Sequence, residues 1–102
     1  MSIMRVKAKA SGERTDVKMM AKHIMETGQR KDKAGNVIPA LFLSEIEVKH
    51  SGKVVFTANL GPAVSKNPYF SFSFAGGASG DTLEVNWKEN TGKSGSETAE
   101  IR

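Results

Sequence analysis

Four side chains with soft sulfur or imidazole ligand atoms lie close together in the sequence: Met19, Met20, His23 and Met25. Thioether sulfur and imidazole nitrogen are ligands that suit Cu(I). On an extended strand, the side chains of Met19, His23 and Met25 would lie on one face. Methionine more often fills irregular gaps in a core or covers a protein interface. We therefore expect no metal site here, with copper binding kept as the alternative.

Other reactive groups are sparse in this chain. It has two histidines, His23 and His50, and no cysteine, so it has no thiolate nucleophile, no disulfide and no cysteine-based zinc site. The sequence contains no Gly-x-Ser-x-Gly motif. Gly76, Gly77 and Gly80 are not followed by the Lys-Ser/Thr pair of a phosphate-binding loop. We expect a chain that is not an enzyme, has no catalytic residue and holds no cofactor.

Alternation of apolar and polar residues predicts strands along most of the chain. Phe70, Phe72 and Phe74 alternate with Ser71 and Ser73, and successive side chains of a strand point to opposite faces. The three rings are therefore expected in a core, because a platform that stacks ligands would interleave its rings with basic residues instead of serines. The predicted core residues are Phe56, Phe70, Phe72, Phe74, Leu83, Val85 and Trp87.

Turn residues divide the chain into about seven predicted strands. These are residues 4–10, 15–25, 41–50, 53–60, the stretch after Pro68 up to Phe74, 82–88 and 97–101. Residues 15–25 contain helix-favouring Met, Lys and Ala, but no capping signal precedes them, and we predict a strand. Residues 27–36 are predicted to form a solvated hairpin tip. The pattern indicates an all-β fold, an immunoglobulin-like antiparallel β-sandwich, in a single domain of residues 1–102.

The charge of the chain is unevenly distributed. It carries 15 Lys and Arg against 11 Asp and Glu, a net charge of +4. Residues 1–33 contain nine of these basic residues and four of the acidic ones. Within them Arg5, Lys7 and Lys9 alternate with apolar residues, which is typical of the solvent face of an edge strand. We expect no nucleic-acid partner, while an anionic solute or an acidic partner stays open.

The residues alone predict a soluble, cytoplasmic chain. The first fifteen residues lack the apolar run that a signal peptide requires. No window approaches the roughly 18 consecutive apolar residues of a membrane-spanning helix. We therefore expect no contact with a membrane.

Adjacent apolar residues predict a second apolar surface that faces outward. Neighbours in a strand point to opposite faces, so one member of Met19 and Met20, or of Val54 and Val55, must face away from the core. Contiguous exposed apolar patches usually mark protein interfaces. The predicted partner-binding residues are Met20, Ile24, Leu41, Leu43 and Val55 at the centre, Ile38 and Pro39 at the margin, and Arg30, Lys31 and Lys33 at the rim.

With these features described, the sequence resembles the Z subunits of the SoxYZ sulfur-carrier complex of thiosulfate-oxidising bacteria. The resemblance covers nearly all of the chain, and its most specific part is the loop sequence GPAVSKNPY at residues 61–69. The other stretches that carry it are MRVKAKA at 4–10, HIMETG at 23–28 with Arg30 and Lys31, and VIPA at 37–40.

The resemblance implies a non-catalytic, immunoglobulin-like partner of a SoxY subunit. In that family SoxY carries sulfur intermediates covalently on a cysteine in a flexible glycine-rich C-terminal arm, and other sulfur-oxidising enzymes dock transiently. The absence of cysteine fits, because this chain cannot be the covalent carrier. The resemblance also implies a periplasmic location, reached by export with the partner. The alternative is a stand-alone periplasmic module that binds copper or another small ligand.

Overall fold

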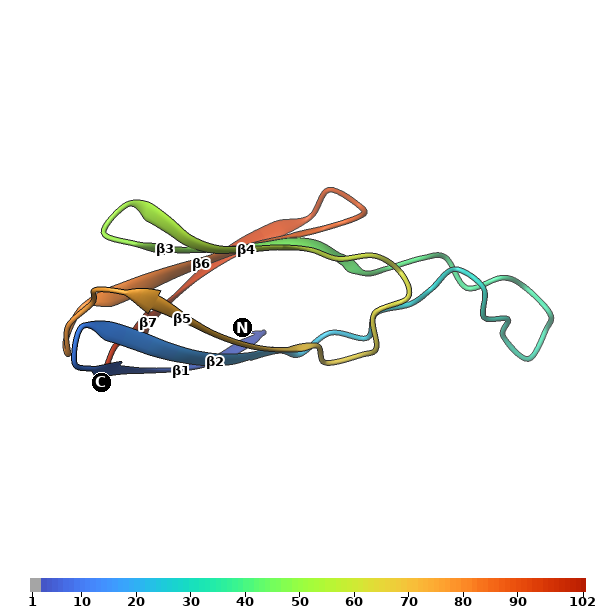
Figure 1. Cartoon of the computed structure of the whole chain (residues 1–102). Helices are drawn as coiled ribbons and strands as arrows, with labels where there is room; N and C mark the ends of the chain where they lie inside the picture. Colours follow the sequence, from blue (N-terminus) through green and yellow to red (C-terminus); the bar gives the residue numbers. More distant parts are fainter. Residues whose placement is uncertain (1–2) are drawn as a thin grey trace.

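Residues 3–102 are described by a computed structural model, and they form seven antiparallel strands in two sheets (Figure 1). The strands are β1 (Met4–Ser11), β2 (Arg14–Ala21), β3 (Leu43–His50), β4 (Lys53–Asn59), β5 (Tyr69–Ala75), β6 (Thr82–Glu89) and β7 (Ser94–Glu100). One sheet has the order β1-β2-β5 and the other the order β4-β3-β6-β7. These residues include no helix long and apolar enough to cross a membrane. The predicted immunoglobulin-like β-sandwich is confirmed.

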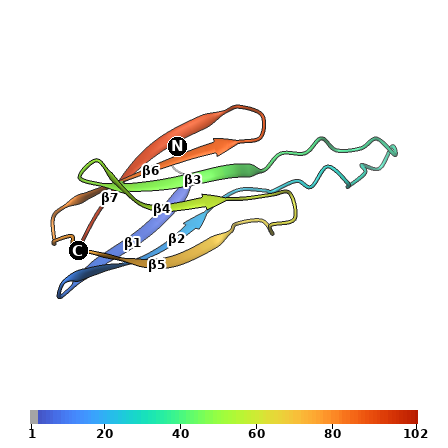
Figure 2. The same cartoon turned by 45° about the horizontal axis from the view of Figure 1, so that its top comes forward.

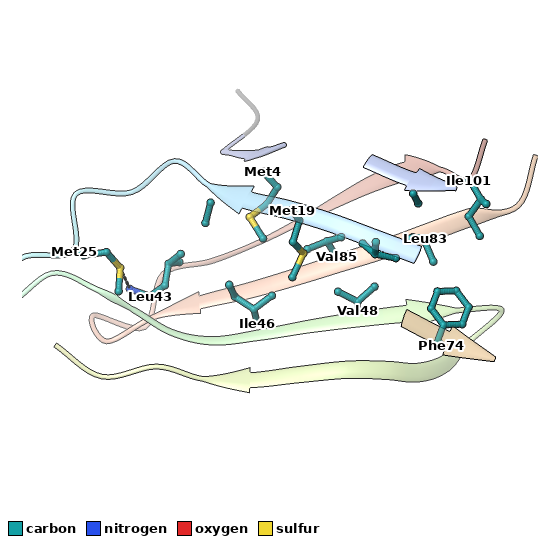
Figure 3. Packing of buried hydrophobic residues seen from close by; sticks show 13 residues of the cluster. Met4, Met19, Met25, Leu43, Ile46, Val48, Phe74, Leu83, Val85 and Ile101 are labelled. Carbon is teal, nitrogen blue, oxygen red and sulfur yellow. Dashed lines mark hydrogen bonds between the residues drawn. The ribbon is translucent and has the colours of Figure 1, made fainter. Parts of the chain in front are cut away.

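Alternation along the strands directs apolar side chains between the two sheets. In β2, Val17, Met19 and Ala21 are buried, while the residues between them face outward. Across the sandwich, Ile46 of β3 and Val85 of β6 have no exposed surface. Figure 3 shows these side chains meeting in one cluster between the sheets. Burial of this cluster is the main favourable contribution to the stability of the sandwich.

The predicted core residues separate into two groups. Leu83, Val85 and Phe74 are buried, whereas the rest are only partly buried and pack against the cluster: Phe56, Phe70, Phe72 and Trp87. The ring of Phe56 stacks on that of Phe72, with centroids 4.2 Å apart. β4 and β5 are edge strands of their sheets, so the rings between them keep some contact with solvent. The predicted core residues all lie in the core or pack against it, and the rings at this edge are only partly buried.

Two shifts in strand register change the direction of residues predicted to face outward. The pairing of β3 with β6 shifts between Leu43 and Glu45, and Leu43 is 0% exposed. The pairing of β3 with β4 omits Val55, so Val55 packs against the core while Val54 is 47% exposed. A bulge of this kind inserts one residue and breaks the period of two. The outward directions predicted for Leu43 and Val55 were therefore wrong.

Two strand ends differ from the predicted ones. β2 ends at Ala21 and does not continue to Met25. The Ala21 N–H donates to the Pro68 carbonyl, but Pro68 has no N–H to return, and the ladder between β2 and β5 stops there. β7 begins at Ser94, before the predicted start at Glu97. Gly95 pairs there with Trp87, whose indole lies so close that a Cβ on residue 95 would clash with it.

Residues 22–42, called the arm below, extend beyond the sandwich between β2 and β3 (Figures 1 and 2). The arm contributes to the long axis of a molecule with extents of 55 × 22 × 20 Å. Its two sides are paired: Glu26 and Leu41 exchange two backbone hydrogen bonds, and Lys31 pairs with Val37. The predicted hairpin tip at residues 27–36 forms the outer part of this longer ribbon.

Candidate partner interface

His23 fixes the base of the arm to the sandwich. Its Nε2 lies 2.6 Å from Oε2 of Glu89 at the end of β6, and the two side chains are 7% and 9% exposed. The Nδ1 atom accepts a hydrogen bond from the Met25 N–H at 3.1 Å. Nε2 therefore carries the ring hydrogen and donates it to the Glu89 carboxylate. This bond satisfies a buried acceptor and holds the start of the arm against β6.

Two asparagines complete the base of the arm. The Asn67 N–H donates to the His23 carbonyl, and Asn67 Oδ1 accepts the His23 N–H at 3.1 Å. Asn90 Oδ1 accepts the Phe42 N–H at 2.9 Å, and Asn90 Nδ2 donates to the Ala40 carbonyl at 3.0 Å. Neither asparagine was predicted from the sequence to have this role. The residue type was a signal at Asn67, because its φ of 52° is a left-handed conformation that asparagine tolerates better than most residues.

The methionine and histidine side chains of residues 19–25 do not share the single strand face that the sequence suggested. Met19 lies in the core at 1% exposure. Met25 is beyond the end of β2, and its sulfur accepts a hydrogen bond from the Leu43 N–H at 3.4 Å (Figure 3). Within residues 3–102, no group of three or more His, Cys, Asp or Glu side chains is placed to hold a metal ion. The absence of copper binding stays a prediction.

The outer part of the arm is basic. Arg30 Nε donates to Glu26 Oε2 at 3.2 Å, and a second guanidinium nitrogen donates to Oε1. These hydrogen bonds lower the pKa of Glu26 and raise the pKa of Arg30. At the tip, Asp32 Oδ1 accepts two backbone N–H groups of the turn that follows it. Lys31 and Lys33 form no ion pair with residues 3–102, so both charges remain available to a partner.

Exposed apolar side chains gather on the arm and beside its base. Ile24 is 59% exposed and Val37 is 55% exposed, both on the arm. Tyr69, at the start of β5, is 61% exposed and pairs with Met20 of β2. Exposed apolar groups in neighbouring segments mark protein interfaces. Val37 was absent from the predicted set because it lies next to a polar turn and outside any strand pattern.

The structure brings some of the predicted partner-binding residues together and separates others. Four lie on the arm: Ile24, Ile38, Pro39 and Leu41. Met20 lies at the end of β2, next to the arm. Leu43 is buried in the core, and Val55 lies near the β3–β4 turn, far along β3 from the arm. The contact residues of a partner are therefore best sought on the arm and beside Met20, a surface called the arm face below.

Comparisons with known proteins identify the family. A search of curated protein sequences found no match. The family model described as sulphur oxidation protein SoxZ matches residues 3–100. This range includes all seven strands and the whole arm. The chain belongs to the SoxZ family of sulphur oxidation proteins.

Proposed function

We propose that this chain is the non-catalytic Z subunit of a SoxYZ sulfur carrier and supports a SoxY subunit that holds sulfur intermediates on its own cysteine. The observation that carries the proposal is the SoxZ family match over residues 3–100. The composition supports it, because a chain of 102 residues without cysteine has no thiol on which to carry sulfur.

The surroundings of the two histidines support a structural role for both. His23 is bonded to Glu89 and to the backbone of Met25. His50 Nε2 lies 2.8 Å from Asp81 Oδ2, and its ring lies 5.3 Å from the ring of Phe74. A histidine that serves as a catalytic base is bonded to a nucleophile. The bonds of these two rings instead fix the arm and the turn before β6.

The arm face is suited to binding a partner subunit. Hydrogen bonds at its base hold the arm before any partner arrives, which lowers the entropy lost on association. Ile24 and Val37 supply exposed apolar surface near each end of the arm. Arg30, Lys31 and Lys33 lie towards the tip, where charges speed encounter more than they add affinity. In this proposal, SoxY covers the apolar residues and meets the basic tip with acidic groups.

In this proposal the complex works in the periplasm. A SoxY partner with an export signal would carry this chain into the periplasm. There the SoxYZ complex would dock transiently with the other sulfur-oxidising enzymes, each of which acts on the cysteine of SoxY. In this arrangement the Z subunit provides binding surface, while all covalent chemistry takes place on its partner.

Co-expression with SoxY tests the proposal. The two chains are purified together, their mass is measured by light scattering, and the sulfur adducts are located by mass spectrometry after incubation with thiosulfate and the other Sox proteins. We expect a stable complex with the adducts on the SoxY cysteine alone. SoxY expressed without this chain is the control and should be less stable. A chain that elutes alone, or that carries the adduct itself, would contradict the proposal.

A further inference from the structure

The sandwich has four edge strands, and three of them have features that prevent further pairing. Along β1, Arg102 exchanges backbone hydrogen bonds with Ala8 and Ala10. β7 carries the carboxylates of Glu97 and Glu100. β4 begins with a lysine and contains the bulge next to Val54. Covering chain, charged side chains and bulges are the common protections of sheet edges.

The fourth edge strand, β5, has none of these protections. Its sequence YFSFSFA contains no charged residue, no proline and no glycine. Its pairing with β2 is regular from Tyr69 to Ala75, without a bulge. Figure 2 shows β5 at the free edge of its sheet. An uncharged, regular and apolar edge is the kind that pairs readily with another strand.

The ladder between β2 and β5 identifies which backbone groups of β5 are free. At one end the Ala21 N–H donates to the Pro68 carbonyl, so residue 68 bonds towards β2. At the other end the Gly76 N–H donates to the Glu13 carbonyl, so residue 76 does the same. The bonding direction alternates along a strand, and the even-numbered residues between them also bond to β2. The residues whose N–H and C=O groups point to the open edge are Tyr69, Ser71, Ser73 and Ala75.

β4, which faces β5 from the opposite sheet, determines which side chains an added strand would need on its inner face. Phe56 of β4 stacks on Phe72 and lies 5.9 Å from Phe70, and these rings are only partly buried. Val54 of β4 is 47% exposed. A strand added beside β5 would direct alternate side chains over these groups. Apolar residues at alternate positions would cover them.

The outer face of the same sheet determines the charge of the added strand. Lys7 of β1 lies directly opposite Lys18 of β2, a pairing of like charges that destabilises a sheet. Neither lysine forms an ion pair with residues 3–102. Asp16, an acid on this face, is already paired with Arg14 at 3.3 Å. A second copy of this chain would bring a second basic face, whereas an acidic outer face would be complementary.

We propose that β5 accepts an extended strand of the partner subunit, which adds to the three-stranded sheet with apolar residues towards β4 and acidic or uncharged residues outward. The inference rests on the proposed function, because it assigns this strand to SoxY. The β5 edge is continuous with the arm face, since Tyr69 pairs with Met20 and Asn67 is hydrogen-bonded to His23. One partner could therefore contact both surfaces.

Amide hydrogen exchange of the chain, free and in the co-purified complex with SoxY, tests the strand addition. The N–H groups of Ser71, Ser73 and Ala75 are expected to exchange rapidly in the free chain and at least about tenfold more slowly in the complex. Those of Phe70 and Phe72, which bond to β2 in both states, are the internal reference. A complex that forms without protecting the three edge amides would overturn the strand addition and leave the proposed function standing. If no complex forms, both fail.

A proline at the edge gives a second test. Ser71→Pro removes an N–H that points away from β2, so the ladder within the sheet is kept. We expect at least about a tenfold loss of affinity for SoxY, with an unchanged circular dichroism spectrum. Ser71→Thr retains the N–H and should bind as the natural chain does. Full affinity of a folded Ser71→Pro variant would contradict the proposal. If that variant does not fold, the exchange measurement decides.

Discussion

The sandwich and the arm are held in place by different forces. Between the sheets, side chains such as Ile46 and Leu83 have no exposed surface, and the strands are fixed by burial. The arm has one well-buried apolar side chain, Met25, at its base, where hydrogen bonds with Glu89, Asn67 and Asn90 also hold it. Further out it depends on backbone pairs between its two sides. The difference indicates a division of roles, in which the sandwich provides stability and the arm provides surface.

The largest expected effect is in the sandwich. Leu43→Ala removes a fully buried side chain, and we expect the free energy of unfolding to fall by about 2–5 kcal/mol. Val37→Ala on the arm, where the side chain is 55% exposed, should change it by no more than about 0.5 kcal/mol. Urea unfolding followed by circular dichroism measures both values. Equal losses would show that the arm contributes to stability as the core does.

A somewhat smaller effect is expected at the junction of the two regions. His23→Ala leaves the carboxylate of Glu89 buried without its ring partner, at a cost of about 2–3 kcal/mol. Glu89→Gln keeps an oxygen acceptor for the Nε2 hydrogen and should cost less. Urea unfolding gives the stabilities, and proteolysis within residues 22–42 reports whether the arm has become mobile. A His23→Ala chain with unchanged stability and protease resistance would remove His23 as the anchor of the arm.

Charge reversal at the arm tip should affect association and not stability. Lys31→Glu combined with Lys33→Glu is expected to lower the association rate with SoxY about tenfold at low salt. The difference should shrink as salt screens the charges. Stopped-flow measurements at several ionic strengths determine the rate. Lys53→Glu, at the start of β4 and away from the arm, is the control. An equal effect there would mean that the net charge of the chain sets the rate and that the position of the charges on the arm does not.

The smallest expected effect is a pH dependence of the sandwich. Asp81 accepts hydrogen bonds from His50 Nε2 and from the Ala78 N–H, and these lower the pKa of Asp81. The stabilisation is present above the ordinary aspartate pKa of about 4 and is lost as the pH falls through the lowered value. The melting temperature of the Asp81→Asn variant should therefore decrease less steeply as the pH is lowered. If it decreases as steeply as that of the natural chain, other carboxylates cause the decrease.

Much of the fold follows from local patterns in the sequence. Phe70, Phe72 and Phe74 show the period of two without interruption, and β5 forms there. The alternation of side chains between the two faces of a strand fails at Leu43 and Val55, because a bulge adds one residue there. The apolar and polar pattern of the sequence does not reveal the position of that bulge. The number of strands was therefore predictable, while the direction of individual side chains near a bulge was not.

The candidate interface was harder to predict than the fold. Apolar residues such as Ile24 could be selected from the sequence, but their exposure depends on where β2 ends, and Pro68 of a distant segment determines that end. The anchors Glu89 and Asn90 are about 65 residues from the start of the arm in sequence, and no local pattern connects them to it. Contacts between distant segments require the folded structure.

The most direct test of the central claim is to place charge on the exposed apolar residues of the arm. Ile24→Asp combined with Val37→Asp alters two side chains that are more than half exposed, so the melting temperature should not change. Titration calorimetry with SoxY should show at least about a hundredfold loss of affinity. Thr98→Asp on β7 is the control, because it adds one negative charge outside the arm face. This variant should bind SoxY with normal affinity. A folded double variant that binds SoxY with full affinity would contradict the account.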